Sequence, residues 1–272
     1  MSSPIPIQAQ VLSEALVIMA DWIASSEYLF PYDSTESTPD RVRRAVTQLR
    51  LPHPWQPLPG PDNTTDVFQR SFPSIRRGEP NAMQIAAIKA ANAMTEPGLL
   101  IIEAPMGLGK TEAALMCAEV LARRSGLGGV FFGLPTMATS NPMFSRVREW
   151  LNAVPAKNRS SITLAHSKAA LNEEYQQLMP WNATMAVYDD AATTQHEASA
   201  VVQEWFLGRK RAILANHVVG TIDQALFTGL KAKHVVLRHL GLASKVVIID
   251  EVHAADVYMR EYLRVVLEWL GA

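Results

Sequence analysis

Two glycines, a lysine and a threonine stand close together in the stretch APMGLGKT, residues 104–111. Gly107 and Gly109 have no β-carbon, so backbone N–H groups could turn inward toward a bound anion. The positive end of a following helix would favour a phosphate chain at the same place. Lys110 would then bind the β- and γ-phosphates, and Thr111 would offer its hydroxyl to Mg²⁺. The pattern predicts a nucleotide site.

The sequence on both sides of this turn supports the same interpretation. Residues 99–103 predict a buried strand, and residues 110–124 predict a helix in which Cys117 is a core residue. The strict phosphate-loop pattern begins with glycine where this chain has Ala104, so a glycine-rich turn before a helix is the alternative. The predicted cofactor-binding residues of the loop are Pro105, Met106, Gly107, Leu108, Gly109, Lys110 and Thr111.

A second, acidic half of the site is predicted in KVVIIDEVHA, residues 245–254. Its apolar run predicts a buried strand that ends in Asp250 and Glu251, and in parallel sheets ligands bind at the carboxyl ends of the strands. Asp250 would hold Mg²⁺, largely through water, and Glu251 would orient and deprotonate an attacking water. An Asp-Glu pair alone is more often a solvated strand end. Together with the phosphate loop, it predicts ATP hydrolysis.

From about residue 80 onward, continuously apolar segments alternate with segments of helical period. This alternation predicts an α/β fold with a parallel sheet covered on both faces by helices. We expect strands at 99–103, 129–135, 161–166 and 245–250, and helices at 81–94, 110–124, 140–152, 168–178, 198–207, 221–230 and 254–270.

The first 80 residues follow a different pattern. Apolar side chains at three- and four-residue spacing predict a helix at 7–26, apolar over much of its circumference and therefore buried. Residues 51–61, LPHPWQPLPGP, contain five prolines and cannot continue a helix or a central strand. We predict a linker or draped surface segment at 31–75.

Composition indicates an ordinary globular protein. Of 272 residues, 48% are hydrophobic and 19% charged, the formal net charge is −1, and there is one cysteine. A single cysteine excludes an internal disulfide and suits a reducing cytoplasm. No apolar run reaches the roughly 18 residues of a membrane span, and the N-terminus lacks the basic start of a secretory signal. We therefore expect a cytoplasmic protein with no membrane partner.

Several motifs together resemble one family. LPTMATSNPMF at 134–144, VGTIDQALF at 219–227, DEVHAADVYM at 250–259 and ADWIAS at 20–25 are similar to segments of the CRISPR-associated helicase–nuclease of type I interference systems, a superfamily 2 DExH helicase. The resemblance covers nearly the whole chain. It implies that the chain corresponds to the end of an all-α HD nuclease domain followed by the first RecA-like helicase lobe.

The resemblance also implies roles for individual residues. Gln84 matches an adenine-recognising glutamine, although a solvated helix residue is the alternative, and His253 matches a residue that couples the nucleotide state to the nucleic acid. Small hydroxyls and loop N–H groups can hold phosphate oxygens without contacting bases. Helix N-capping is the alternative, or an additional role, for the two threonines. The implied nucleic-acid contacts are Thr136, Gly220, Thr221, Asp223 and Gln224.

One implied metal site departs from the family. Asp21 resembles the last metal-ligand aspartate of the HD nuclease, and a carboxylate on an apolar helix is costly unless it is paired or metal-bound. The preceding His-Asp pair and the other ligand histidines have no counterpart, and the seven histidines show no spacing typical of a metal cluster. We expect no nuclease activity, and a divalent transition metal only if the missing residues are supplied elsewhere.

The expected organisation is an HD-domain helix at 1–30, a Pro-rich linker at 31–75 and a RecA-like ATP-binding lobe at 76–272. The family's second RecA-like lobe has no counterpart, so ATP should bind weakly and turn over slowly. Implied partners are single-stranded DNA, an RNA-guided CRISPR surveillance complex, and the missing second lobe and HD domain. Two alternatives remain, a non-enzymatic nucleotide-binding regulator and a fragment of another superfamily 2 helicase.

Overall fold

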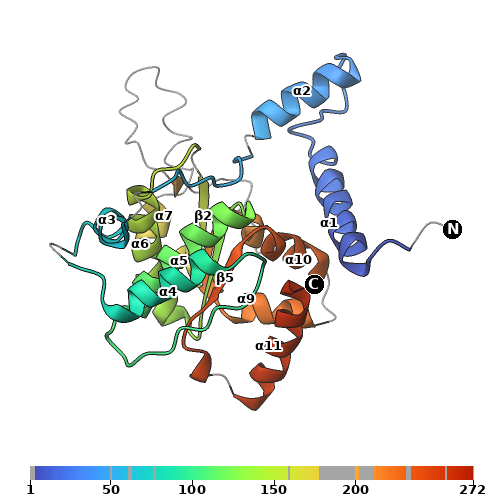
Figure 1. Ribbon diagram of the computed structural model, residues 1–272. Helices are drawn as coiled ribbons and strands as arrows, with labels where there is room; N and C mark the ends of the chain where they lie inside the picture. Colours follow the sequence, from blue (N-terminus) through green and yellow to red (C-terminus); the bar gives the residue numbers. More distant parts are fainter. Residues whose placement is uncertain are drawn as a thin grey trace, which may run out of the picture.

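The computed structural model describes residues 4–49, 51–60, 63–75, 78–158, 160–177, 200–201, 211–230, 234–254 and 256–271 (Figure 1). Within them, five parallel strands form one sheet in the order β3-β2-β4-β1-β5. The predicted α/β class with a parallel sheet is confirmed. The strands are β1 (Val130–Leu134), β2 (Ser160–Ala165), β3 (Ala200–Val201), β4 (His217–Thr221) and β5 (Val246–Ile249).

Helices precede, follow and connect these strands, as Figure 1 shows. Short 3-10 turns also occur, among them Ala169–Leu171, Ala212–Leu214, Phe227–Gly229 and Val252–Ala254. The α-helices are α1 (Ile7–Ala24), α2 (Thr38–Leu49), α3 (Thr64–Ser71), α4 (Ala82–Ala93), α5 (Lys110–Ser125), α6 (Met137–Ala153), α7 (Glu173–Gln177), α9 (Asp223–Leu226), α10 (Val235–Ala243) and α11 (Val257–Leu270).

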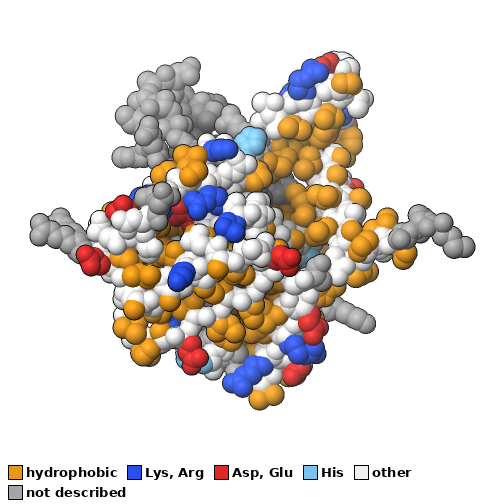
Figure 2. All heavy atoms as spheres, viewed as in Figure 1, with side chains coloured by type: hydrophobic (Ala, Val, Ile, Leu, Met, Phe, Trp, Pro, Cys, Tyr) orange, Lys and Arg blue, Asp and Glu red, His pale blue; other side chains and the backbone are white. Residues whose placement is uncertain are grey.

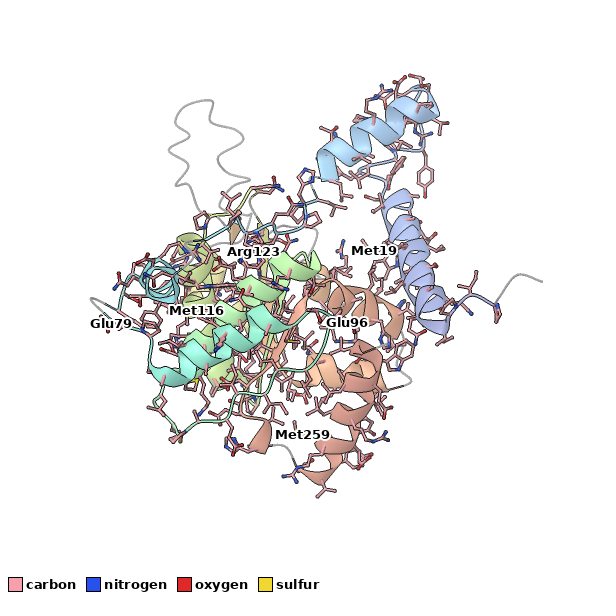
Figure 3. The ribbon with its side chains drawn as sticks, viewed as in Figure 1. Met19, Glu79, Glu96, Met116, Arg123 and Met259 are labelled. Carbon is pink, nitrogen blue, oxygen red and sulfur yellow. The ribbon has the colours of Figure 1, made fainter. Side chains whose placement is uncertain are left out.

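Alternate side chains of each strand enter cores on opposite faces of the sheet, as the two-residue period of a strand requires. Phe132 of β1 packs with residues of α5 and α6, including Leu115 and Trp150. Phe131, its neighbour, packs on the other face with Leu242 of α10. A further apolar layer lies on the outer side of α5, where Met116 of α5 packs against α4 (Figure 3). The helix α5 is therefore held from two sides.

The strand register brings several loops to one edge of the sheet. Gly133 of β1 pairs with Gly220 of β4 and Ile249 of β5, and Gly220 pairs with Ala165 of β2. Because all these strands are parallel, the segments that follow them leave the sheet at the same edge. A Cβ at Gly220 would lie 2.4 Å from the Ala165 carbonyl oxygen, so this close strand approach requires glycine.

The N-terminal helix is less buried than its sequence predicts. Ala15 is its one buried residue, and Val17 is 67% exposed. One face packs on α10, and Met19 points from α1 toward that contact (Figure 3). A helix that is apolar over much of its circumference packs mainly on α10 among the described elements, so its other faces stay open. By length and composition alone α1 could also cross a membrane, contrary to our expectation that no run is long enough.

The segment 31–75 is more ordered than a linker. It contains α2 and α3, and between them Trp55 is 2% exposed inside the core next to Trp150. The prolines prevent regular structure, but the backbone still bonds to the body, with Trp55 N donating to Gly128 O at 2.9 Å. One large aromatic side chain anchors the segment, which fits the predicted alternative of a draped surface segment better than a free linker. The domain boundaries themselves stay a prediction.

Other expected elements differ from the structure. Residues 99–103 form no strand, because they do not pair with any strand of the described sheet, in which β5 is an edge strand. Leu99 is 66% exposed there. The helix expected at 198–207 is contradicted at Ala200–Val201, which form β3, and its other residues lie outside the described ones. The helix α10 was not anticipated.

Candidate nucleotide site

The phosphate-loop segment and the acidic segment meet in one cavity of about 290 Å³ at the carboxyl edge of the sheet. The two segments are far apart in the sequence, and α5 and β5 bring them together by packing on each other. A ligand in this cavity could contact both at once. The cavity is lined by Met106, Gly107, Gly109, Lys110, Thr111, Glu112, Arg146, Asp250 and Glu251.

The backbone of the loop needs its glycines. Gly107 and Gly109 have φ angles of +80° and +74°, in the left-handed region that other residues rarely adopt. At Gly109 space is also short, because a Cβ would lie 2.4 Å from the Gln84 side-chain nitrogen. The Nζ of Lys110 donates to the carbonyl oxygens of Ala104 at 2.8 Å and Pro105 at 3.3 Å. The loop thus curls around its own lysine.

Gln84 supports the loop from α4. Its Oε1 accepts from Asn81 N at 2.9 Å, and its Nε2 donates to Gly109 O at 3.1 Å. Asn81 completes a capping box and donates to Leu108 O at 2.9 Å. Gln84 is 4% exposed, so the alternative of a solvated helix residue was wrong. Contact with adenine stays a prediction, and the observed bonds assign Gln84 to holding the loop.

The acidic wall of the cavity begins where β5 ends. Asp250 N donates to Gly133 O at 2.9 Å, which continues the ladder with β1. Glu251 then takes a φ of +55°, and its N–H donates to Asp250 Oδ1 at 2.9 Å. Burial raises the pKa of the Asp250 carboxyl, as does the charge of Glu251, while the charges of Lys110 and Arg146 oppose the rise. A divalent cation here would favour the ionised carboxylate.

His253 lies outside the cavity but contacts its acidic wall. Its exposed ring places Nε2 3.1 Å from Oε2 of Glu251. A side chain so placed connects the residue proposed to handle water with the segment that leads to α11. The predicted coupling role is compatible with this contact and stays a prediction.

Two cavity residues were missed in the sequence. Arg146 of α6 donates to the carboxylate of Glu112, which follows directly after the phosphate-loop threonine. Glu112 could have been noticed from that adjacency. Arg146 belongs to no motif, and it reaches the cavity only because α6 packs near α5.

The residues expected to contact nucleic acid lie at the ends of β1 and β4 or just after them, at the same edge of the sheet. Thr136 is exposed and caps α6 by accepting from Thr139 N at 3.2 Å. Thr221 is buried at the end of β4 and does not cap α9, whose N-cap position is Ile222. The capping alternative thus holds for Thr136 and was wrong for Thr221.

The other two implied contacts lie on α9. Asp223 is exposed and begins the helix, and the carbonyl oxygen and Oε1 of Gln224 accept from Arg238 at 3.2 and 2.9 Å. Arg238 therefore fixes Gln224, while Asp223 is left toward solvent. Contact of either residue with nucleic acid stays a prediction.

The predicted remnant of a metal site lies elsewhere. Asp21 is exposed on α1, so water solvates its carboxylate and no paired charge is required. Among the described residues, no group of three or more His, Cys, Asp or Glu side chains could hold a metal ion. The family role of Asp21 stays a prediction.

No family model matches the chain. It is 42% identical over 271 residues to the CRISPR-associated nuclease/helicase Cas3 of Streptococcus thermophilus, covering 97% of this chain and 28% of that protein. The crystal structure of T. fusca Cas3-ATP has a TM-score of 0.76 at 36% identity, over 97% of this chain and 29% of that one. A CRISPR RNA-guided surveillance complex in a pre-nicking state contains a chain with a TM-score of 0.58 and 31% identity, over 97% and 24%.

Proposed function

We propose that this chain, which is homologous over almost its whole length to a segment of the CRISPR-associated Cas3 nuclease/helicases, binds ATP and Mg²⁺ as a RecA-like lobe. It spans about 28% of the length of those relatives, so the activities of a whole helicase–nuclease are part of the proposal. The observation that carries it is the shared cavity of Lys110, Thr111 and Asp250.

The cavity fits a magnesium nucleotide in the chemistry of its donors. The hydroxyl of Thr111 and the carboxylate of Asp250 are oxygen ligands of the kind that Mg²⁺ prefers, and loop N–H groups suit phosphate oxygens. Bound Mg²⁺ would neutralise charge that develops on the phosphates. For binding, Lys110 exchanges its carbonyl partners, Ala104 and Pro105, for phosphate oxygens.

Glu251 is the residue proposed to orient and deprotonate the attacking water. It lines the cavity next to Asp250. Its positive φ angle turns the chain away from the direction of the strand. His253 contacts the Glu251 carboxylate, so a change in what that carboxylate binds would change its contact with His253. Hydrolysis would then be linked to movement of the segment that begins α11.

Single-stranded DNA is the proposed track for the larger protein. Its contacts would come from Thr136, Gly220, Thr221, Asp223 and Gln224, which follow or end two strands beside the cavity. The structural similarity to a chain of a CRISPR surveillance complex supports recruitment by such a complex. ATP-driven translocation and DNA degradation in antiviral defence, in the cytoplasm, would need the second RecA-like lobe and the HD domain.

Nucleotide titration tests the proposal. Wild type should bind a fluorescent ATP analogue with Mg²⁺, and Lys110→Ala should weaken binding at least about tenfold, because a charge-assisted contact to phosphate is lost. Lys89→Ala, at an exposed position of α4, is the matched control and should bind normally. Absence of binding by wild type would contradict nucleotide binding. Rapid DNA-stimulated ATP turnover by this chain alone would contradict the need for a second lobe.

A further inference from the structure

One cationic side chain that lines the cavity, that of Arg146, has no role in the function proposed above. Arg146 lies on α6, which supplies none of the phosphate loop, and its side chain is 46% exposed. Its Nη2 donates to Oε1 of Glu112, and in the described part of the chain this is its one hydrogen-bond partner. A guanidinium has five N–H donors, so most of them remain available toward the cavity.

The charges of the lining make this arginine important for an anionic ligand. Three carboxylates line the cavity, those of Glu112, Asp250 and Glu251, against two cations, Lys110 and Arg146. Glu112 is also close to the loop, since a Cβ on Gly109 would lie 3.1 Å from its Oε2. Without Arg146 a nearly buried carboxylate would face the phosphates uncompensated, which is unfavourable. Arg146 removes that repulsion and adds a donor group.

The position of Arg146 relates it to the outer end of a phosphate chain. The amides of Gly107 and Gly109 belong to the loop and suit the inner phosphates. Asp250 lines the same cavity, and its carboxylate would help to hold a Mg²⁺ that accompanies the phosphates. Because Lys110 and Arg146 line the cavity together with Asp250, both cationic side chains can face the phosphates that such a Mg²⁺ would accompany.

We infer that Arg146 binds the terminal phosphate of a nucleoside triphosphate, with Glu112 orienting its guanidinium, so that the site prefers ATP to ADP. The inference rests on the proposed nucleotide binding and adds a selectivity residue to it. A planar guanidinium can bond Glu112 along one edge and phosphate oxygens along another, which a lysine cannot do. ADP lacks the phosphate concerned and gains nothing from the contact.

Isothermal titrations of the chain with Mg²⁺ and either ADP or a non-hydrolysable ATP analogue test this inference. Arg146→Gln should weaken the ATP analogue about tenfold, the typical effect of one charge-assisted hydrogen bond, and ADP by about twofold or less. Arg146→Lys keeps the charge and should show a smaller loss of the same selectivity. The matched control is Arg148→Gln on the same helix, whose arginine pairs with Glu174 at 2.7 Å; it should bind both nucleotides normally.

The outcomes separate the inference from the proposed function. Equal weakening of both nucleotides by Arg146→Gln would mean that Arg146 only neutralises Glu112, and unchanged binding would mean that it contacts no phosphate; either result overturns the inference alone. Failure of wild type to bind any nucleotide overturns the proposed function and the inference with it. Circular dichroism verifies folding, and if Arg146→Gln does not fold, the selectivity of Arg146→Lys decides.

Discussion

Trp55 provides a direct test of how the proline-rich segment is held. Its side chain is 2% exposed, with ring centroids 5.4 Å from Trp150 and 5.0 Å from His217. A buried tryptophan removes roughly 200 Å² from water, worth about 5 kcal/mol at 25 cal/mol per Å². A compact unfolded state lowers this figure. Trp55→Ala should therefore reduce the free energy of unfolding by about 4 kcal/mol, within the range for large aromatic truncations.

Urea titration followed by far-ultraviolet circular dichroism measures this loss. Trp55→Phe keeps an aromatic ring and should lose about half as much, while Tyr32→Ala, 89% exposed in the same segment, should change stability by less than about 0.5 kcal/mol. If Trp55→Ala were as mild as Tyr32→Ala, the segment would be a linker after all. The reasoning from burial would then be refuted.

Three further changes test other parts of the fold by the same denaturation assay. Arg70→Met should cost about 3 kcal/mol, because Glu119, 3% exposed, then stays buried without its partner at 2.7 Å; a neutral result would contradict this. Burial, and secondarily the charge of Lys245, lowers the pKa of His217 from 6.5 to about 3, so stability should fall as the pH drops from 6.5 toward 3. His217→Phe should flatten that dependence, and an unchanged pH profile would exclude His217 as its source. Gly129→Ala should destabilise by about 3 kcal/mol or more, since its Cβ would lie 1.8 Å from Asn216 O; a stable variant would show that the strands can separate.

The sequence predicted the elements whose signals are local. The helix after the phosphate loop and the strands β1, β2 and β5 were expected because continuous apolar runs and helix formers mark them. Gly107 and Gly109 were recognised because a phosphate loop needs residues without a β-carbon, and the structure adds that both have a left-handed backbone. The cavity that joins Lys110 to Asp250 followed from the parallel arrangement.

What the sequence did not predict depends on contacts between distant residues. Residues 99–103 are as apolar as a strand, but strand formation needs a partner that no local pattern supplies. No local pattern marks Trp55 as a core residue, because its burial depends on packing against Trp150, which is distant in the sequence. Arg146 enters the site through the packing of α6. Gln84 was expected at the site from the family resemblance, but its burial in a capping box was not.

The helix α2 extends from the body and α1 packs on α10 with one face, and apolar side chains gather over both helices in Figure 2. Val42 and Val46 of α2, with Leu16 and Val17 of α1, are 46–67% exposed. The body of the chain does not use these faces for its own packing. These exposed side chains therefore contribute little to the free energy of unfolding of the sheet.

The register of the paired strands also fixes the distances between parts of the site. The ends of β1, β4 and β5 are aligned at Gly133, Gly220 and Ile249, so the phosphate cavity and the segment that begins at Thr136 lie at a spacing fixed by backbone hydrogen bonds. Deleting one residue inside β1 would draw Thr136 back by about 3.3 Å and exchange the two faces of the strand. The frame therefore tolerates changes of side chain more readily than changes of length.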